Sequence, residues 1–207
     1  MSKVYRHSDK AIKRLRSEMS REFQNMSITI RPRAMTLRET RRRVAEMYDS
    51  LYEVCLMEYE EVAERARRDA QREAQGEEKP KDEIDFVKGI LSAFSLLTKY
   101  SYRNEWRRKR DRLVESLMTC ETRIEVRVSL QRALNVLDNQ VRQYADIVTD
   151  EARLDAFEEA GVRRVRWNTQ HDGRVCGTCD ARDGQVYDIH SLPTKHYRCR
   201  CYYTPVF

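Results

Sequence analysis

Apolar residues recur every three or four positions through most of the chain, which is the period of an α-helix with one buried face. Four such stripes stand out, over residues 12–23, 44–62, 84–97 and 130–148. Between the first two, the β-branched run before Pro32 predicts an extended connector over residues 27–36. The sequence GEEKP at residues 76–80 predicts a second break.

The second long helix has a recognisable start. Thr36 is followed three residues later by Glu39, which is the spacing of a capping box. We expect this helix to run to about Gln75. After Val62, however, it carries no stripe of large apolar residues, so we expect its last part to fray.

The last part of the chain has a different pattern. Residues 149–160 predict a short capped helix that stops at Gly161. Beyond it, Asp-Gly pairs at 172–173 and 183–184 are turn signals. Three segments with the character of short strands surround these turns, VRRVRW, GQVYDI and CYYTPV.

The composition supports a helical body with narrow apolar seams. Gly and Pro number only 6 and 4, charged residues make up 36% and apolar residues 40%. Such a supply is too thin for a large spherical core. The predicted fold class is therefore mainly α: an elongated body of several long helices over residues 1–148, then a small α+β module of short strands over residues 149–207.

Charge and hydropathy argue against some classes of protein. The net charge of +6 comes from 40 basic and 34 acidic residues that are interspersed, which is typical of a solvated helical surface rather than a dedicated nucleic-acid binder. No apolar run approaches the roughly 20 residues of a membrane span. The start lacks the apolar core of a secretory signal. We therefore expect reduced cysteines, which favours metal binding over disulfides.

A cluster of metal-ligating residues marks the module. Four of the six cysteines lie between residues 176 and 201. A CxxC pair is the spacing of a zinc knuckle, whose tight turn brings two thiolates within about 4 Å of each other. A second half-site follows at a spacing found in paired zinc motifs. The candidate ligands are Cys176, Cys179, His196, Cys199 and Cys201.

These five residues compete for the four positions of a tetrahedral structural Zn²⁺ site. His196 with Cys199 repeats the two-residue gap of the first half-site, and we favour that pair. Cys199 and Cys201 would face the same side of an extended strand, so both could instead reach the metal. A third reading of the cluster is a pair of disulfides.

Other cysteines and histidines fit the cluster less well. His171 and His190 have weaker spacing and are interpreted as surface or turn histidines. Cys55 and Cys120 lie in helical stretches and are interpreted as inert buried thiols. Because the cluster holds more ligands than positions, it leaves no room for an activated water, and we expect no catalysis. The sequence contains no P-loop, GxSxG, HExxH or H-x-E motif.

The module resembles the phage head morphogenesis, or Mu F-like minor head, proteins. Their signature is a strand with Trp, an Asp, a CxxC, a D/N-G turn and H-P-x-C-R-C before a closing strand. This chain has RWNTQHDGRVCGTCDARDGQVYDI and then KHYRCRCYYTPV. The resemblance covers residues 149–207. It departs at Tyr197, where the family usually has Pro, and this loosens the turn beside His196.

The resemblance implies a structural minor capsid protein of a tailed phage, involved in head morphogenesis. It implies assembly in the host cytoplasm and a place in the virion, at the capsid interior or the portal vertex. The implied partners are the portal protein, the major capsid protein, or both, with no membrane and no small-molecule substrate. Non-specific contact with packaged DNA is expected through Arg107, Arg108, Lys109 and Arg110.

Two alternatives remain open. One is a zinc-ribbon nucleic-acid-binding protein, supported by the same Arg-dense segment. The other is a metal-dependent nuclease or hydrolase that uses His171, Asp172 or the metal. For the structural reading, the stripes at 84–97 and 130–148 exceed what a thin core could bury. We expect a partner to cover part of them, the first stripe above all.

Overall fold

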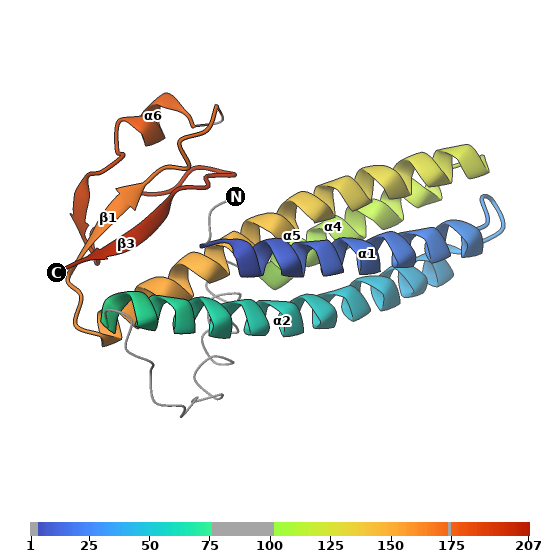
Figure 1. Cartoon of the computed structure of the whole chain (residues 1–207). Coiled ribbons are helices and arrows are strands. Elements are labelled where there is room, and N and C mark those ends of the chain that lie inside the picture. Colours follow the sequence, from blue (N-terminus) through green and yellow to red (C-terminus); the bar gives the residue numbers. More distant parts are fainter. Residues whose placement is uncertain (1–3, 76–101, 174) are drawn as a thin grey trace. The chain divides into compact units, whose positions relative to one another are not determined.

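The computed structural model describes residues 4–75, 102–173 and 175–207, whose helices and strands are drawn in Figure 1. The helices are α1 (Arg6–Thr29), α2 (Leu37–Gln75), α4 (Tyr102–Met118), α5 (Arg123–Glu159) and α6 (Gly177–Asp180). The strands are β1 (Arg164–Asn168), β2 (Val186–Asp188) and β3 (Tyr202–Val206). The mainly α fold with a small C-terminal strand module is thus confirmed. The apolar stripe at 84–97 lies outside the described residues.

Side chains that hydrogen-bond to the backbone mark the C-terminal end of α1 and the N-terminal end of α2. The backbone N–H of Glu39 donates to Thr36 Oγ1 at 3.2 Å, which confirms the predicted cap. Residues 27–29, predicted as extended, are instead the last residues of α1. Ser27 Oγ and Thr29 Oγ1 donate hydrogen bonds to the carbonyls of Gln24 and Met26, three residues earlier in the chain. These bonds allow residues 27–29 to end the helix although the run is β-branched.

The helix α5 is longer than predicted. The prediction of a separate short helix that starts at Thr149 is wrong, because α5 is continuous through this residue. Thr149 is buried, and its Oγ1 donates to the Ala145 carbonyl at 2.9 Å instead of capping a new helix. The predicted domain boundary between residues 148 and 149 therefore lies inside α5. Gly161, with φ +79°, follows the helix end as expected.

The prediction that the second half of α2 frays is wrong, because this helix continues to Gln75. Ala63, Ala66 and Ala70 are buried at helical spacing, and Ala70 belongs to the same core as Ala156 and Phe157 of α5. Alanine adds little to a hydrophobic pattern, but its small side chain lets a neighbouring element approach closely. A stripe of alanines therefore holds this half of α2, and a search for large apolar residues misses it.

The chain divides into two compact units. The module unit comprises the described residues 4–10, 59–75, 143–173 and 175–207. The bundle unit comprises the described residues 11–58 and 102–142. Helices α1, α2 and α5 each contribute residues to both units. The limits of the two units therefore fall inside these helices, and no single position in the sequence separates one unit from the other.

In the described part of the bundle unit, segments of α1, α2, α4 and α5 pack side by side (Figure 1). Polar contacts join α1 to α2 (Arg14 to Glu58), α1 to α5 (Arg16 to Asp138), α2 to α4 (Tyr48 to Trp106) and α4 to α5 (Glu105 to Gln140). Trp106 is 4% exposed, and its indole N–H donates to the Tyr48 carbonyl at 2.9 Å. Its ring contacts those of Tyr48, Tyr52 and Tyr102 at centroid distances of 5.2–5.9 Å.

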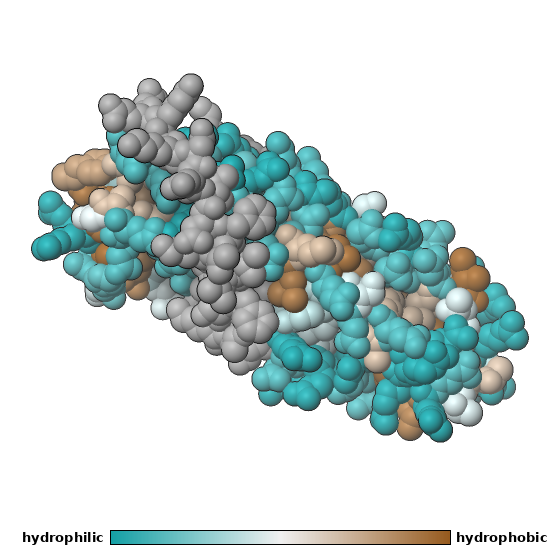
Figure 2. Space-filling model, turned by 90° about the horizontal axis from the view of Figure 1, so that it is seen from below, coloured by the Kyte–Doolittle hydropathy of each residue, from teal (hydrophilic) through white to brown (hydrophobic). Residues whose placement is uncertain are grey.

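The stripe at 130–148 is buried within the chain itself. Leu130, Leu137, Val141, Tyr144 and Val148 are all at most 5% exposed, and Leu134 is half-buried. The chain itself therefore buries most of this stripe, contrary to the expectation that its core is too thin to do so. The face drawn in Figure 2 is mainly hydrophilic, with hydrophobic residues in small separate patches. Among the described residues, no helix combines the length and apolar character needed to cross a membrane.

The three predicted strands form one antiparallel sheet of order β2-β1-β3. Val165 pairs with Tyr187 on one side, and Trp167 pairs with Tyr203 on the other. Exposed and buried residues alternate along β1, and Val165 and Trp167 are fully buried. This face of the sheet belongs to the same core as the ends of α2 and α5 and three of the cluster cysteines, Cys179, Cys199 and Cys201.

Trp106→Ala should destabilise the bundle unit by about 3–5 kcal/mol, because it removes a buried ring and leaves a cavity among three tyrosines. Ile124→Ala is the control, since Ile124 is 73% exposed and should change stability by less than about 0.5 kcal/mol. Urea unfolding followed by circular dichroism measures both. Equal midpoints for the two variants would contradict the packing role of Trp106.

Candidate metal centre

The first half-site is built on a single helical turn, α6. Cys176 occupies the N-cap in an extended conformation, with φ −83° and ψ 157°. The backbone N–H groups of Asp180 and Ala181 donate to the carbonyls of Cys176 and Gly177 at 2.9 and 3.0 Å. This turn brings the thiols of Cys176 and Cys179 to one side. Cys179 is buried, whereas Cys176 is half-buried.

The second half-site lies in the loop that leads into β3. The backbone N–H of Cys199 donates to the His196 carbonyl at 3.0 Å, which closes a tight turn. Arg198 within this turn has φ 60°, in the left-handed region that side chains other than glycine seldom adopt. Cys199 and Cys201 are buried, and His196 is exposed at the mouth of the cluster.

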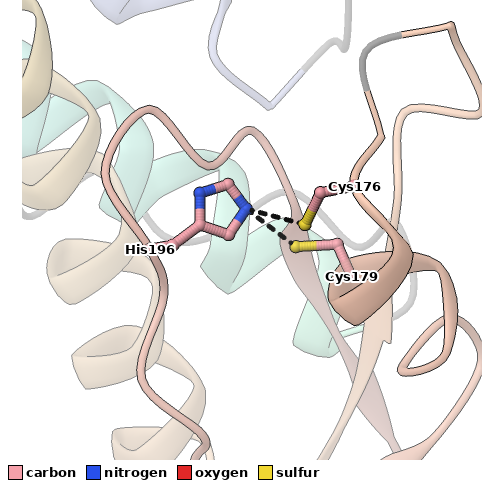
Figure 3. Close-up of side chains that lie close together, drawn as sticks. All are labelled: Cys176, Cys179 and His196. Atoms are coloured by element: carbon pink, nitrogen blue, oxygen red, sulfur yellow. Dashed lines mark hydrogen bonds between the residues drawn. The ribbon is translucent and has the colours of Figure 1, made fainter.

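The two half-sites converge. His196 Nε2 lies 3.3 Å from Cys176 Sγ and 3.1 Å from Cys179 Sγ (Figure 3). On the buried side, Cys179 Sγ lies 3.7 Å from Cys199 Sγ. Donor atoms bound to one tetrahedral zinc would lie about 3.5–3.8 Å apart, given Zn–S of about 2.3 Å and Zn–N of about 2.0 Å. The observed spacings are close to these values.

The five predicted residues form two overlapping groups. Cys176, Cys179 and His196 make one, and Cys179, Cys199 and Cys201 make the other, with the ligating atoms of each group within 4.8 Å of one another. Cys179 belongs to both groups and is the centre of the cluster. With four thiols and one imidazole in this arrangement, the cluster could bind a metal ion.

The orientation of His196 suits metal binding. Its Nδ1 lies 2.8 Å from the Tyr197 carbonyl oxygen. A carbonyl only accepts, so Nδ1 carries the hydrogen and the lone pair on Nε2 faces the thiols of Cys176 and Cys179. Metal-ligating histidines commonly use their second nitrogen in this way, and the bond fixes both tautomer and ring orientation.

The thiols differ in how readily they ionise. A hydrogen bond from the Cys201 thiol lowers the pKa of Cys199 to about 5. The same bond raises the pKa of Cys201. Burial raises the pKa of Cys179 to about 11, whereas backbone hydrogen bonding near Cys179 lowers the pKa of Cys176. The hydrogen bond to the Tyr197 carbonyl raises the pKa of His196.

The remaining candidates lie outside these groups. His171 is 71% exposed, with Nε2 3.5 Å from an Asp183 carboxylate oxygen. Asp172 pairs with Arg200 at the surface. His190 is 69% exposed and lies near Glu158. Of the residues that the structure describes, no carboxylate joins either ligating group. Cys55 and Cys120 are buried cysteines of the bundle unit and form no disulfide, in keeping with their interpretation as buried thiols.

Two polar contacts that join the helices of the module unit to its strands and loop were not found from the sequence. Arg153, 3% exposed, donates to Glu73 at 2.6 Å and to the Tyr203 carbonyl at 3.3 Å, and so links α5, α2 and β3. Lys195 bonds to Asp150 of α5 at 2.6 Å. These partners are far apart along the chain, and no local spacing indicates that they meet.

No protein-family model, no curated protein and no solved structure matches this chain.

Metal binding should release protons at neutral pH. Cys179, with its pKa of about 11, is a thiol at pH 7 and must lose its proton to bind a metal, whereas Cys199, with a pKa of about 5, is already a thiolate. The metal affinity should therefore fall at least about tenfold per unit as the pH drops from 8 to 7, and more steeply below about pH 5, where Cys199 also protonates. Competition with a chelator of known pH dependence measures this. An affinity that does not change between these pH values would contradict it.

Proposed function

We propose that the cluster binds one structural Zn²⁺ through Cys176, Cys179, His196 and Cys199. Thiolates and a neutral imidazole are the donors that tetrahedral zinc prefers. The contacts of Cys179 with both His196 and Cys199, at 3.1 and 3.7 Å, support this set. Cys201 then stays outside the coordination sphere, as a buried thiol that hydrogen-bonds to Cys199.

A structural role fits this set better than catalysis does. Four protein donors fill a tetrahedral zinc and leave no position for an activated water. Asp172, which the hydrolase alternative would use, pairs with Arg200, and the nearby Asp183 accepts a hydrogen bond from the backbone N–H of Thr169. The module's sheet has only three short strands, and metal binding would supply much of its folding free energy.

Freshly reduced protein should contain about one zinc per chain. Cys199→Ser should abolish stoichiometric zinc and loosen the module, whereas Cys201→Ser should retain the zinc with an affinity lowered about 10–100-fold, because it removes only a supporting hydrogen bond. Cys55→Ser controls for the loss of a buried thiol, since Cys55 lies in the bundle unit. Elemental analysis and limited proteolysis are the measurements.

The variants at the two loop cysteines, Cys199 and Cys201, show which of them binds the metal. Zinc that is retained by Cys199→Ser but lost by Cys201→Ser would reverse the assignment of these two residues. Wild-type protein with far less than one zinc per chain would overturn the zinc site altogether.

At the level of the whole chain, we propose a structural minor head protein of a tailed phage, without catalytic activity. The observation that carries this proposal is that CxxC and HxxCxC converge in a three-stranded module. These are the motifs on which the likeness of residues 149–207 to the phage minor head proteins rests. The proposed partners are the portal protein, the major capsid protein, or both. The proposed location is the capsid interior or the portal vertex.

One observation favours contact with nucleic acid. Along α4, Arg103, Arg107, Arg108 and Arg112 are exposed, with Lys109 and Arg110 half-buried beside them. Such a helix would contact the phosphates of packaged DNA without reading its sequence. It equally supports the second candidate, a zinc-ribbon nucleic-acid-binding protein. In that case binding would be sequence-selective and would not need a capsid.

The protein should sediment with heads when it is produced together with the portal and major capsid proteins of its phage. Cys179→Ser should be incorporated less than wild type, because the module loses its metal, and Cys55→Ser should behave as wild type. Density-gradient sedimentation followed by mass spectrometry measures incorporation. Sequence-selective DNA binding by the protein alone would favour the zinc-ribbon candidate, and zinc-dependent DNA cleavage would favour a nuclease.

A further inference from the structure

A polar network that the zinc proposal does not use lies beside the ligand loop. Lys195 directly precedes His196, and its ammonium lies 2.6 Å from Asp150 Oδ2. The same ammonium also donates to Tyr5 Oη at 3.1 Å and to the Cys201 carbonyl. A lysine ammonium has three hydrogens, so these three acceptors satisfy it completely.

Tyr5 completes the network from the other end of the chain. Its hydroxyl lies 2.8 Å from Asp150 Oδ1 and 2.7 Å from the Cys201 carbonyl oxygen, and it can donate its one hydrogen to either. Tyr5 is 6% exposed. Burial, with Asp150 nearby, raises the pKa of Tyr5 well above its usual value, so the phenol keeps this hydrogen.

The network fixes both ends of the loop that carries the ligands. Lys195 stands just before His196, and the Cys201 carbonyl stands at the entry to β3, so the residues between them are held against Asp150 on α5. The ammonium also lies 4.5 Å from the centroid of the Tyr203 ring in β3. The Lys195 and Asp150 side chains are only 17% and 14% exposed, so solvent screens this pair weakly.

We propose that Tyr5, Asp150 and Lys195 form a clamp that positions the second half of the metal site and couples metal binding to the packing of Tyr5 at the start of α1. The inference rests on the proposed zinc site. By linkage, a clamp that strengthens metal binding must itself be strengthened by the metal to the same extent. Residues that orient metal ligands from outside the coordination sphere commonly change metal affinity by about 10–100-fold.

The test compares two cations of the module unit, the half-buried Lys195 and the buried Arg153. Lys195→Met removes the ammonium next to the ligand loop, whereas Arg153→Met removes a guanidinium that bonds to Glu73 and the Tyr203 carbonyl. Lys195→Met in the full chain should lower zinc affinity about 10–100-fold, as measured by chelator competition, and should alter the visible spectrum of the Co²⁺-substituted protein. Arg153→Met should lower stability but leave zinc affinity and the Co²⁺ spectrum close to wild type.

Tyr5→Phe keeps the ion pair and tests the coupling. Alone it should lower zinc affinity, but in the Lys195→Met background it should add little, because the clamp is already broken. Zinc should also slow hydrogen exchange of the Asp9 amide, which donates to the Tyr5 carbonyl at 2.9 Å. That protection should be lost in Lys195→Met.

The outcomes separate the clamp from the zinc site. If the wild type binds zinc and both Lys195→Met and Tyr5→Phe bind it equally well, the clamp is wrong and the zinc site stands. If Arg153→Met weakens zinc binding as much as Lys195→Met does, the effect is general destabilisation and the clamp is again wrong. If Lys195→Met does not fold, Tyr5→Phe decides alone. If the wild type binds no metal, both proposals fall.

Discussion

Antiparallel pairing of β1 with β2 and β3 is the constraint on which the geometry of the Cys/His cluster depends. β1 leads into the segment that carries Cys176 and Cys179, and β3 follows directly after Cys201. Because Trp167 pairs with Tyr203, the two chain segments are held in a fixed register. That register brings thiols from the two half-sites to within 3.7 Å of each other. A slip by one residue would turn Trp167 out of the core.

The core beneath the sheet continues into helices that begin far away in the sequence. Cys179, Cys199 and Cys201 share one buried cluster with Ala70 of α2 and Phe157 of α5. The back of the Cys/His cluster is therefore formed by packed helices, and the exposed His196 lies at its open side. Packing of this kind holds the side chains that could bind a metal ion in a fixed arrangement.

Polar side chains connect the same parts of the module unit. Arg153 joins α5 to α2 and β3, and Lys195 joins the ligand loop to α5. A buried cation is costly unless its hydrogens are satisfied. Both cations meet carboxylates and backbone carbonyls, so they favour one arrangement of loop and helix over others.

The sequence by itself determined the features that depend on local spacing. The helical periods, the Thr36 cap, the three strands and the five residues of the cluster that could bind a metal ion could all be predicted, because each rests on neighbours a few positions apart. The tertiary structure decided the rest. The alanine stripe of α2 and the continuity of α5 through Thr149 depend on what packs against them. The contacts of Tyr5 and Arg153 join residues that are distant along the chain. The pairing of His196 with both CxxC thiols depends on the fold of the loop. Local spacing encodes neither of these features.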